Sequence, residues 1–262
     1  MPELPEVEIF KRFVDSKALR KKIVRAEISC PDLVKEGRPK ALIKNLVNQS
    51  FVSTERRGKY LFAKLSNDSG ALILHFGMSG SITYYSPRQA VPQYGCLTVS
   101  FSKGDTITYV NPRRIGLFGY TSSIDSFIKK KRLGPDILSI SKEEFLNRVR
   151  KNGRVVKAVL MDQSLFAGIG NIYSDEILFQ AKINPKTKAT ALTEESWIRL
   201  FGLIRRVLNQ AINSDAEPER MPHNFLITNR RKNGSCPVCK SKLVKTSVMQ
   251  RPTYFCPRCQ TT

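Results

Sequence analysis

The chain has 262 residues, with 44 Lys and Arg against 22 Asp and Glu and a formal net charge of +22 at pH 7. That length suits two modest domains, each with its own core. So high a positive charge predicts a polyanionic partner, with nucleic acid first and an acidic membrane surface second. We expect no membrane span, because the sequence has no run of about 20 apolar residues. We expect no secretory signal, because the N-terminal segment is acidic and lacks an apolar stretch.

The first predicted element is a helix over residues 3–20, in which apolar residues recur on one face. Pro2 precedes it directly, and a small second residue normally allows the initiator methionine to be removed. The secondary amine of an N-terminal proline reacts with an aldehyde carbon to give a charged iminium, which favours elimination. Glu3 stands beside it and can transfer protons. The plainer alternative is that Pro and Glu here only begin a helix.

From about residue 23 to 120 the pattern is that of short strands rich in β-branched and aromatic residues. We predict seven of them: Ile23–Ser29, Phe51–Thr54, Tyr60–Leu65, Ala71–Phe76, Ser81–Tyr85, Leu97–Phe101 and Thr106–Val110. So many short strands indicate a two-sheet sandwich or a barrel with the first helix packed against it. We assign residues 1–121 to this domain.

The second half of the chain is predicted to be helical after a connector over residues 122–140, which carries the basic run Lys129–Arg132. Most basic runs are solvated loops, although this one could also contact phosphates. Within residues 141–230 a capping box beginning at Ser141 and a cap at Thr193 mark helix starts. The predicted helices are Phe145–Lys151, Val155–Met161, Asn171–Ala181 and Glu194–Ile212.

Residues 231–262 contain the strongest single motif, two Cys-x2-Cys pairs separated by 16 residues. Cys236, Cys239, Cys256 and Cys259 match zinc-ribbon spacing and predict one tetrahedral, structural zinc ion. Chance or a pair of disulfides is the alternative. The residues between the pairs can form a hairpin with Arg251 near its tip, either as a surface charge or aimed at a phosphate. Cys30 and Cys96 look isolated, so the cysteines fit a reducing, intracellular setting.

Two further segments are candidate phosphate sites. Gln163–Asn171 contains paired glycines before a helix, which would present bare amide groups to an anion. A turn used only for helix packing is the alternative. Lys59 enters a predicted strand, where it either points to solvent or holds a phosphate beside the N-terminal amine.

Two glycine-bounded loops, His75–Gly80 and Asn111–Gly116, each place an apolar residue beside a basic one. Enzymes that act on bases in duplex DNA extrude the nucleotide and fill the gap that it leaves. Apolar wedges with an arginine suit that task. Either loop alone would be read as an ordinary hairpin.

Taken together, these segments resemble the formamidopyrimidine-DNA glycosylase/endonuclease VIII family, and its formamidopyrimidine branch in particular. The match runs nearly end to end through PELPEVE, RRGKYL, HFGMSG, NPRR, DQSLFAGIGNIYSDEILF and the cysteine hairpin. The resemblance implies an α+β fold, with an N-terminal two-sheet β-sandwich flanked by helices. A C-terminal helical domain with a helix–two-turn–helix and a zinc-ribbon hairpin would follow, with DNA in the cleft between the domains.

The resemblance also implies a set of catalytic roles. Pro2 would form a Schiff base with C1′ of the damaged nucleotide, and Glu3 would be the acid and base. Lys59 would hold phosphate and assist β-elimination, and Arg251 would assist δ-elimination. The remaining implied roles are DNA contacts: Glu6 supporting Glu3 from the same helical end, Met78, Arg113 and Ile115 in the gap, Lys157 and Asn171 on the backbone, and His75 and Tyr94 nearby.

Several positions depart from the family pattern. An aliphatic Ile115 stands where an intercalating aromatic is usual, Asn111 replaces an aspartate, and Tyr94 replaces a histidine that often contacts DNA. Asn213–Pro222 is charged and proline-bearing where family members that grip 8-oxoguanine have a Gly/Ser/Thr-rich loop. We therefore do not expect strong action on 8-oxoguanine, while ring-opened purines, oxidised pyrimidines and abasic sites stay open as substrates.

We accordingly expect a bifunctional DNA glycosylase/AP lyase of base excision repair, working as an intracellular monomer on damaged double-stranded DNA. Its one expected cofactor is the structural zinc. The main alternative is a non-catalytic nucleic-acid-binding zinc protein on the same scaffold. A basic protein bound to a membrane surface is a third reading, but the chain shows no amphipathic anchor for it.

Overall fold

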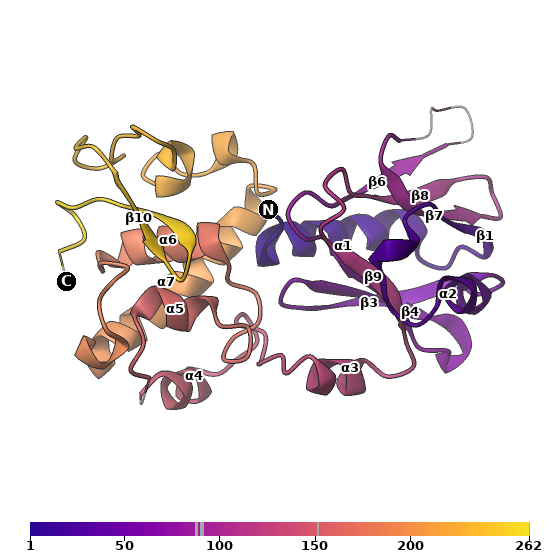
Figure 1. Ribbon diagram of the computed structural model, residues 1–262, viewed down its shortest axis with the longest axis horizontal. Coiled ribbons are helices and arrows are strands. Elements are labelled where there is room, and N and C mark those ends of the chain that lie inside the picture. The colour runs from indigo at the N-terminus through magenta and orange to yellow at the C-terminus, as the bar shows by residue number, and fades with distance from the viewer. Residues whose placement is uncertain (87–88, 90–91, 151, 262) are drawn as a thin grey trace. The chain divides into compact units, whose positions relative to one another are not determined.

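The computed structural model describes residues 1–86, 89, 92–150 and 152–261 (Figure 1). The chain forms two compact units. The first consists of Met1–Pro2 and Glu6–Arg132, and the second of Glu3–Pro5 and Leu133–Thr262. Glu3 therefore belongs to the unit built from the second half of the chain, although it follows Pro2 directly.

The first unit contains two β-sheets. The four-stranded sheet has the order β1 (Ile23–Ile28), β7 (Gly95–Phe101), β8 (Thr106–Val110), β6 (Ser81–Tyr85). The five-stranded sheet has the order β2 (Val34–Glu36), β9 (Leu117–Thr121), β5 (Ala71–His75), β4 (Tyr60–Leu65), β3 (Phe51–Arg57). β2 pairs with β9 in parallel, and the other pairs are antiparallel.

The core of this unit joins both sheets to helix α1 (Leu4–Ala18). Val7, Val14 and Ala18 of α1 are buried with residues of both sheets, as their helical spacing requires. Phe51 of β3 and Phe101 of β7 bring the sheets together, with ring centroids 6.3 Å apart. The predicted two-sheet domain with a packed first helix is confirmed.

Four elements of this unit are additional to the predicted ones: β2, β9, α2 (Pro39–Leu46) and α3 (Ile124–Lys130). The α3 helix lies inside the segment predicted as a connector. Phe127 anchors it, because its ring is buried against Tyr60 and Phe62. β9 was not predicted because it contains a glycine, Gly119, which is unfavourable in a strand. The structure requires this glycine, since a Cβ added there would lie 2.6 Å from the Glu36 backbone oxygen. A side chain there would push β2 away.

The second unit consists of helices α4 (Lys142–Val149), α5 (Val156–Met161), α6 (Asn171–Ala181) and α7 (Glu194–Asn213), with the hairpin β10 (Val244–Val248) and β11 (Arg251–Phe255). Ser141 Oγ accepts from the Glu144 amide and Thr193 Oγ1 from the Ser196 amide, so both predicted residues cap their helices. Of the predicted capping box only this serine half is seen, because the Glu144 carboxylate pairs with Arg148. Lys151, the predicted end of the first of these helices, lies outside the described residues. Short 3-10 turns complete the chain: Pro31–Leu33, Ser66–Asp68, Ala189–Ala191, Pro218–Arg220 and Leu226–Asn229.

No helix in the described part of the chain has both the length and the apolar content to cross a membrane.

Cys30 and Cys96 form a disulfide, so the prediction that they are isolated is wrong. Strands β1 and β7 are hydrogen-bonded neighbours, and the amides of Ser29 and Cys30 both donate to the Cys96 oxygen, at 3.0 and 3.4 Å. The two cysteines are 66 residues apart in sequence, so only the strand pairing reveals the contact. The cysteine pattern therefore gives no argument for a reducing setting.

Alkylation tests this disulfide. With chelator and denaturant but no reductant, four of the six cysteines are expected to react, and all six after reduction. Reduction is also expected to lower the free energy of unfolding by up to about 4 kcal/mol, because the bond closes a long loop. Mass spectrometry counts the added groups, and six additions without reductant would show that the bond is absent.

Candidate active site

Glu3 lies at the beginning of helix α6 and is fully buried. Its carboxylate accepts three backbone N–H groups: Gly170 at 2.8 Å, Ile172 at 2.9 Å and Tyr173 at 3.3 Å. These are the unsatisfied amides at the positive end of the helix, which favour an anion. The sequence predicted an anion site here and assigned it to a phosphate. The correction is that the protein's own carboxylate occupies it.

The turn before α6 is shaped to receive this carboxylate. Gln163 closes it by donating to the oxygens of Met161 and Ile169, at 2.9 and 2.8 Å, and accepting from the Gly168 amide at 3.1 Å. Gly168 has a φ of +129°, and a Cβ there would come within 2.5 Å of Leu4 Cδ1. The Leu4 amide donates to the Gly168 oxygen at 3.2 Å. A glycine is therefore needed for residues 3–4 to reach this place.

Pro2, Glu6 and Lys59 are half-buried residues of the first unit. Lys59 lies in the turn between β3 and β4, where Gly58 has a φ of +58°, directly before the strand Tyr60–Leu65 that it was predicted to enter. The positive charge of Lys59 acts on the nearby His75. Burial, and then the Lys59 ammonium, lower the pKa of His75 to about 4. His75 is therefore neutral near pH 7, and its Nδ1 accepts from the Gly77 amide at 3.3 Å.

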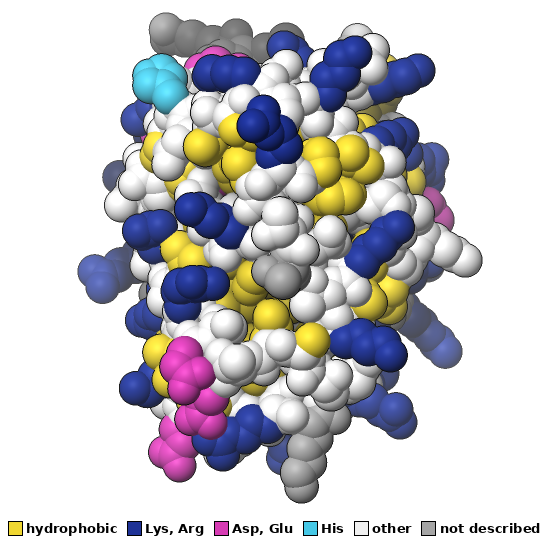
Figure 2. Space-filling view, turned by 90° about the vertical axis from the view of Figure 1, so that its left-hand side faces the viewer, with side chains coloured by type: hydrophobic (Ala, Val, Ile, Leu, Met, Phe, Trp, Pro, Cys, Tyr) yellow, Lys and Arg dark blue, Asp and Glu magenta, His cyan; other side chains and the backbone are white. Residues whose placement is uncertain are grey.

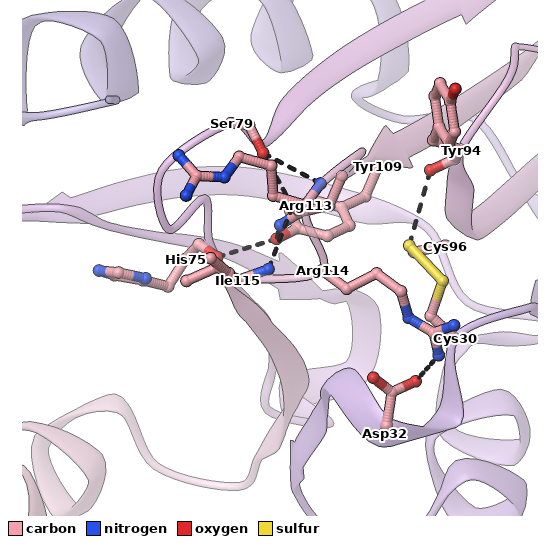
Figure 3. The surroundings of a disulfide bond; sticks show 11 residues. Cys30, Asp32, His75, Ser79, Tyr94, Cys96, Tyr109, Arg113, Arg114 and Ile115 are labelled. Atoms are coloured by element: carbon pink, nitrogen blue, oxygen red, sulfur yellow. Dashed lines mark hydrogen bonds and ion pairs between the residues drawn. A yellow bond between two sulfur atoms is a disulfide. The ribbon is translucent and has the colours of Figure 1, made fainter.

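The two predicted wedge loops pack against each other (Figure 3). The Met78 amide donates to the Ile115 oxygen at 3.2 Å, and the Arg113 amide donates to Ser79 Oγ at 3.3 Å. Gly77 allows this approach, because its φ is +59° and a Cβ would overlap the Ile115 oxygen. The structure thus brings Met78 (38% exposed), Ile115 (44% exposed) and the exposed Arg113 onto one surface.

Asn111, a departure from the family pattern, holds this pair of loops together and is 1% exposed. Its Oδ1 accepts from Ser79 Oγ and the Ile115 amide, both at 3.3 Å. Its Nδ2 donates to the Tyr109 hydroxyl at 2.7 Å, while that hydroxyl donates to the His75 oxygen at 3.0 Å. An aspartate could not supply the Nδ2 donor. Burial raises the pKa of Tyr109 to about 12, so its hydroxyl keeps its proton.

Tyr94 projects from the same region, with 62% of its surface exposed. Its backbone oxygen accepts from the Asn111 amide at 3.0 Å, which ties it to the start of the arginine loop. Figure 3 shows it beside the Cys30–Cys96 disulfide. Tyr94 is free to contact a ligand through its ring, but no described interaction assigns one.

Lys157 departs from its predicted role. It is fully buried, and its ammonium donates to Asn171 Oδ1 at 2.8 Å, Asp175 Oδ1 at 2.6 Å and Thr253 Oγ1 at 2.7 Å. All three of its donors are used inside the second unit, so a direct contact with the DNA backbone does not fit this structure. Asn171 is half-buried, and its Nδ2 donates to the Pro252 oxygen at 2.9 Å.

Asp175 and Arg230 complete this cluster and were missed in the sequence. Asp175 Oδ2 accepts from Arg230 Nε at 2.8 Å. A signal was available, because Asp175 and Glu176 are charged residues in the middle of a predicted helix whose neighbouring residues are mostly apolar. Such a residue requires a buried partner. The sequence does not tell which of its 44 basic residues supplies it.

The four predicted zinc ligands come together at one end of the second unit. Their Sγ atoms all lie within 4.8 Å of one another, with Cys236–Cys259 at 3.8 Å and Cys239–Cys256 at 3.4 Å. A tetrahedral zinc with Zn–S bonds of ~2.3 Å places sulfur atoms roughly 3.8 Å apart. The donor set fits one zinc ion. Four protein ligands leave no position for substrate, so this zinc is structural.

Removing a zinc ligand is expected to unfold the hairpin that carries Arg251. Cys256→Ser should release the zinc and lower DNA cleavage by at least about tenfold, because such sites derive their folding energy from the metal. Zinc content by absorption spectroscopy and cleavage of a nicking substrate are the measurements. Cys30→Ser, outside the cluster, should keep its zinc. Unchanged cleavage by Cys256→Ser would show that the hairpin is dispensable.

Comparison with known proteins covers nearly the whole chain. Residues 1–118 match the formamidopyrimidine-DNA glycosylase N-terminal domain, residues 133–222 the H2TH domain of the same enzymes, and residues 236–262 a zinc finger found in FPG and IleRS. The formamidopyrimidine-DNA glycosylase of Carboxydothermus hydrogenoformans is 33% identical over 99% of this chain and 100% of its own. That of Ruthia magnifica is 33% identical over the full length of both chains.

Solved structures give the same picture. The Lactococcus lactis formamidopyrimidine-DNA glycosylase, non-covalently bound to DNA containing an AP site, matches with a TM-score of 0.88 and 29% identity over both complete chains. A MutM complex with DNA containing carbocyclic 8-oxoguanine matches with a TM-score of 0.88 and 30% identity over the same extent. The domain order, the fold and the cysteine cluster agree, and this chain belongs to the formamidopyrimidine-DNA glycosylase family of base-excision-repair enzymes.

Proposed function

We propose that the protein removes damaged bases and cleaves the resulting abasic strand through the N-terminal amine of Pro2. The placement of Glu3 carries the proposal. Glu3 directly follows Pro2 in the chain, and three backbone amides at the start of α6 hold its carboxylate in place. A group that can donate and accept a proton is therefore the neighbour of the Pro2 amine in the chain. A fixed acid/base beside a nucleophile is the arrangement that covalent catalysis requires.

The proposed reaction begins when the Pro2 nitrogen attacks C1′ and the base leaves, with a proton supplied by Glu3. Glu3, now a carboxylate, takes the proton of the Pro2 nitrogen and passes it to O4′ as the C1′–O4′ bond opens, which gives the iminium. The iminium draws electrons from C2′, whose proton is removed. β-Elimination then expels the 3′ phosphate, and δ-elimination expels the 5′ phosphate. Lys59 and Arg251 are proposed to hold these phosphates, since both are basic and Arg251 is exposed. Hydrolysis of the product frees the proline amine.

The DNA contacts are proposed from the paired loops of the first unit. Met78 and Ile115 would fill the gap left by the extruded nucleotide, and Arg113 would face the unpaired base. The high positive charge of the chain supports a polyanionic partner such as DNA. Figure 2 shows Lys and Arg side chains spread over one whole face, with Asp and Glu gathered mainly at one corner. Binding should weaken steeply with salt, as counterion release requires.

The lesion preference is proposed from Asn213–Pro222. This segment is a compact turn in which Ser214 Oγ donates to the Arg220 oxygen at 3.0 Å. Arg220 also pairs with Asp215 and with Glu217. These bonds within the segment restrain it, and its charged and proline residues replace the Gly, Ser and Thr residues of a loop that closes over a flipped base. We therefore propose ring-opened purines, oxidised pyrimidines and abasic sites as better substrates than 8-oxoguanine.

Borohydride trapping on duplex DNA with one abasic site tests the proposed function. The processed protein is expected to give a covalent adduct, and a panel of defined lesions then orders the substrates. If the processed wild-type chain gives no adduct, the protein is a non-catalytic nucleic-acid-binding protein on this scaffold. Equal or faster release of 8-oxoguanine than of ring-opened guanine would overturn the proposed preference alone.

A further inference from the structure

A buried charge cluster joins helices α5 and α6 to the zinc hairpin. We call Lys157, Asp175 and Arg230 the hairpin-docking cluster. The side chains of Lys157 and Asp175 have no exposed surface, and that of Arg230 is 14% exposed. Asp175 bridges the two cations, at 2.6 Å from Lys157 Nζ and 2.8 Å from Arg230 Nε. Charges this deeply buried are retained only where they are paired and hydrogen-bonded.

The cluster grips the three residues that follow Arg251 in strand β11. The Pro252 oxygen accepts from Arg230 Nη2 at 3.0 Å and also from Asn171. Thr253 Oγ1 accepts from Lys157, and the Tyr254 amide donates to Asp175 Oδ2 at 3.1 Å. The Arg230 guanidinium also lies 5.0 Å from the Tyr254 ring centroid.

The position of Arg251 depends on these hydrogen bonds between the hairpin-docking cluster and strand β11. It follows a two-residue turn in which Met249 and Gln250 both have positive φ, and its own side chain is exposed. An isolated two-stranded hairpin is marginally stable in water. The Arg251 backbone is fixed from the cluster side, because Thr253 Oγ1 also donates to the Arg251 oxygen at 3.0 Å. A shift of β11 on α6 would therefore move Arg251.

We propose that Asp175 and Arg230 are positioning residues that, with Lys157, hold Arg251 where it acts on the phosphate expelled in the second elimination. This inference rests on the proposed function, in which Arg251 assists δ-elimination. Misplacing a catalytic group by about 1 Å costs roughly 100-fold in rate. The cluster should therefore affect the second elimination much more than the first.

The charges of the cluster decide which variant is informative. Removing Asp175 would leave two cations buried together, which threatens the fold. Burial lowers the pKa of Lys157 and the Asp175 carboxylate opposes that shift, so Lys157 also relies on this partner. Arg230→Ala removes the contacts to Pro252 and Tyr254 and leaves the Lys157–Asp175 pair balanced. Arg231 is the next residue and is exposed, so Arg231→Ala is the matched control.

The experiment measures both products on a duplex with one abasic site under single-turnover conditions. Arg230→Ala is expected to lower the ratio of δ- to β-elimination product about tenfold, with β-elimination and borohydride trapping within about twofold of wild type. Zinc content should stay unchanged. Arg231→Ala should keep the wild-type ratio. Arg230→Lys should restore only part of it, because an ammonium cannot donate in the fork geometry of a guanidinium.

A double variant separates positioning from a general structural effect. If Arg230 acts through Arg251, adding Arg230→Ala to Arg251→Gln should lower the ratio no further. An unchanged ratio in Arg230→Ala, a further loss in the double variant, or an equal loss of trapping, zinc and δ-product would overturn the inference. A wild-type protein that forms no adduct would instead refute the proposed function, so the two failures are distinguishable.

Discussion

Protein that retains Met1, or that carries an acetyl group on Pro2, is expected to lose covalent trapping on abasic DNA by about 1,000-fold or more. The reason is that an amide nitrogen has no available lone pair, so it cannot attack C1′. The measurement is borohydride trapping with matched preparations whose N-termini are verified by mass spectrometry. The effect should be this large because no other group in the proposed reaction replaces the nucleophile.

Pro2→Gly is the informative companion to the blocked forms. A glycine amine is primary, so it still attacks C1′ but gives an imine that is partly neutral and a poorer electron sink. Trapping should therefore be weakened but not abolished. DNA binding measured with a non-cleavable abasic analogue should be unchanged in every form. A Met1-retaining protein that traps as well as the processed one would remove Pro2 from the mechanism.

Glu3→Gln is expected to lower base release by about 100- to 10,000-fold, the range for loss of a general acid or base. The glutamine side chain cannot transfer the proton. Both carboxylate oxygens of Glu3 accept from amides at the start of α6, so the NH2 group of a glutamine would leave at least one of these amides without an acceptor. Each unsatisfied buried donor costs about 1–3 kcal/mol, so the melting temperature should fall as well.

The matched control for this variant is Glu8→Gln. Glu8 lies in α1, is partly exposed and pairs with Arg56 at 2.8 Å. Base release by Glu8→Gln should stay within about twofold of wild type. Single-turnover release from a duplex with a ring-opened guanine measures both variants. If Glu3→Gln releases the base at the wild-type rate, the acid must be sought elsewhere.

Local patterns made much of the fold predictable. The caps at Ser141 and Thr193, the strands with regular alternation and the paired cysteines are all short-range signals, and each forms as expected. The missed elements are short or irregular. Helix α3 carries a basic run that resembles a loop, and β9 contains Gly119. Their formation depends on Phe127 and on the approach of β2, neither of which a local pattern contains.

The candidate site divides in the same way. The sequence by itself determined which chemical groups are present: a proline at position 2 followed by a glutamate, four thiolates for zinc, and a large excess of positive charge. These follow from residue type and short spacing, which folding does not change.

Only the tertiary structure decided which groups meet. Glu3 fills the amide site 167 residues away, Cys96 pairs with Cys30, and Lys157 turns inward to Asp175 and Thr253 instead of outward to DNA. In each case the side chain could either remain exposed to solvent or bind a buried partner from a distant segment of the chain. A buried charge or thiol that finds such a partner is held by it, and no pattern within one segment names the partner.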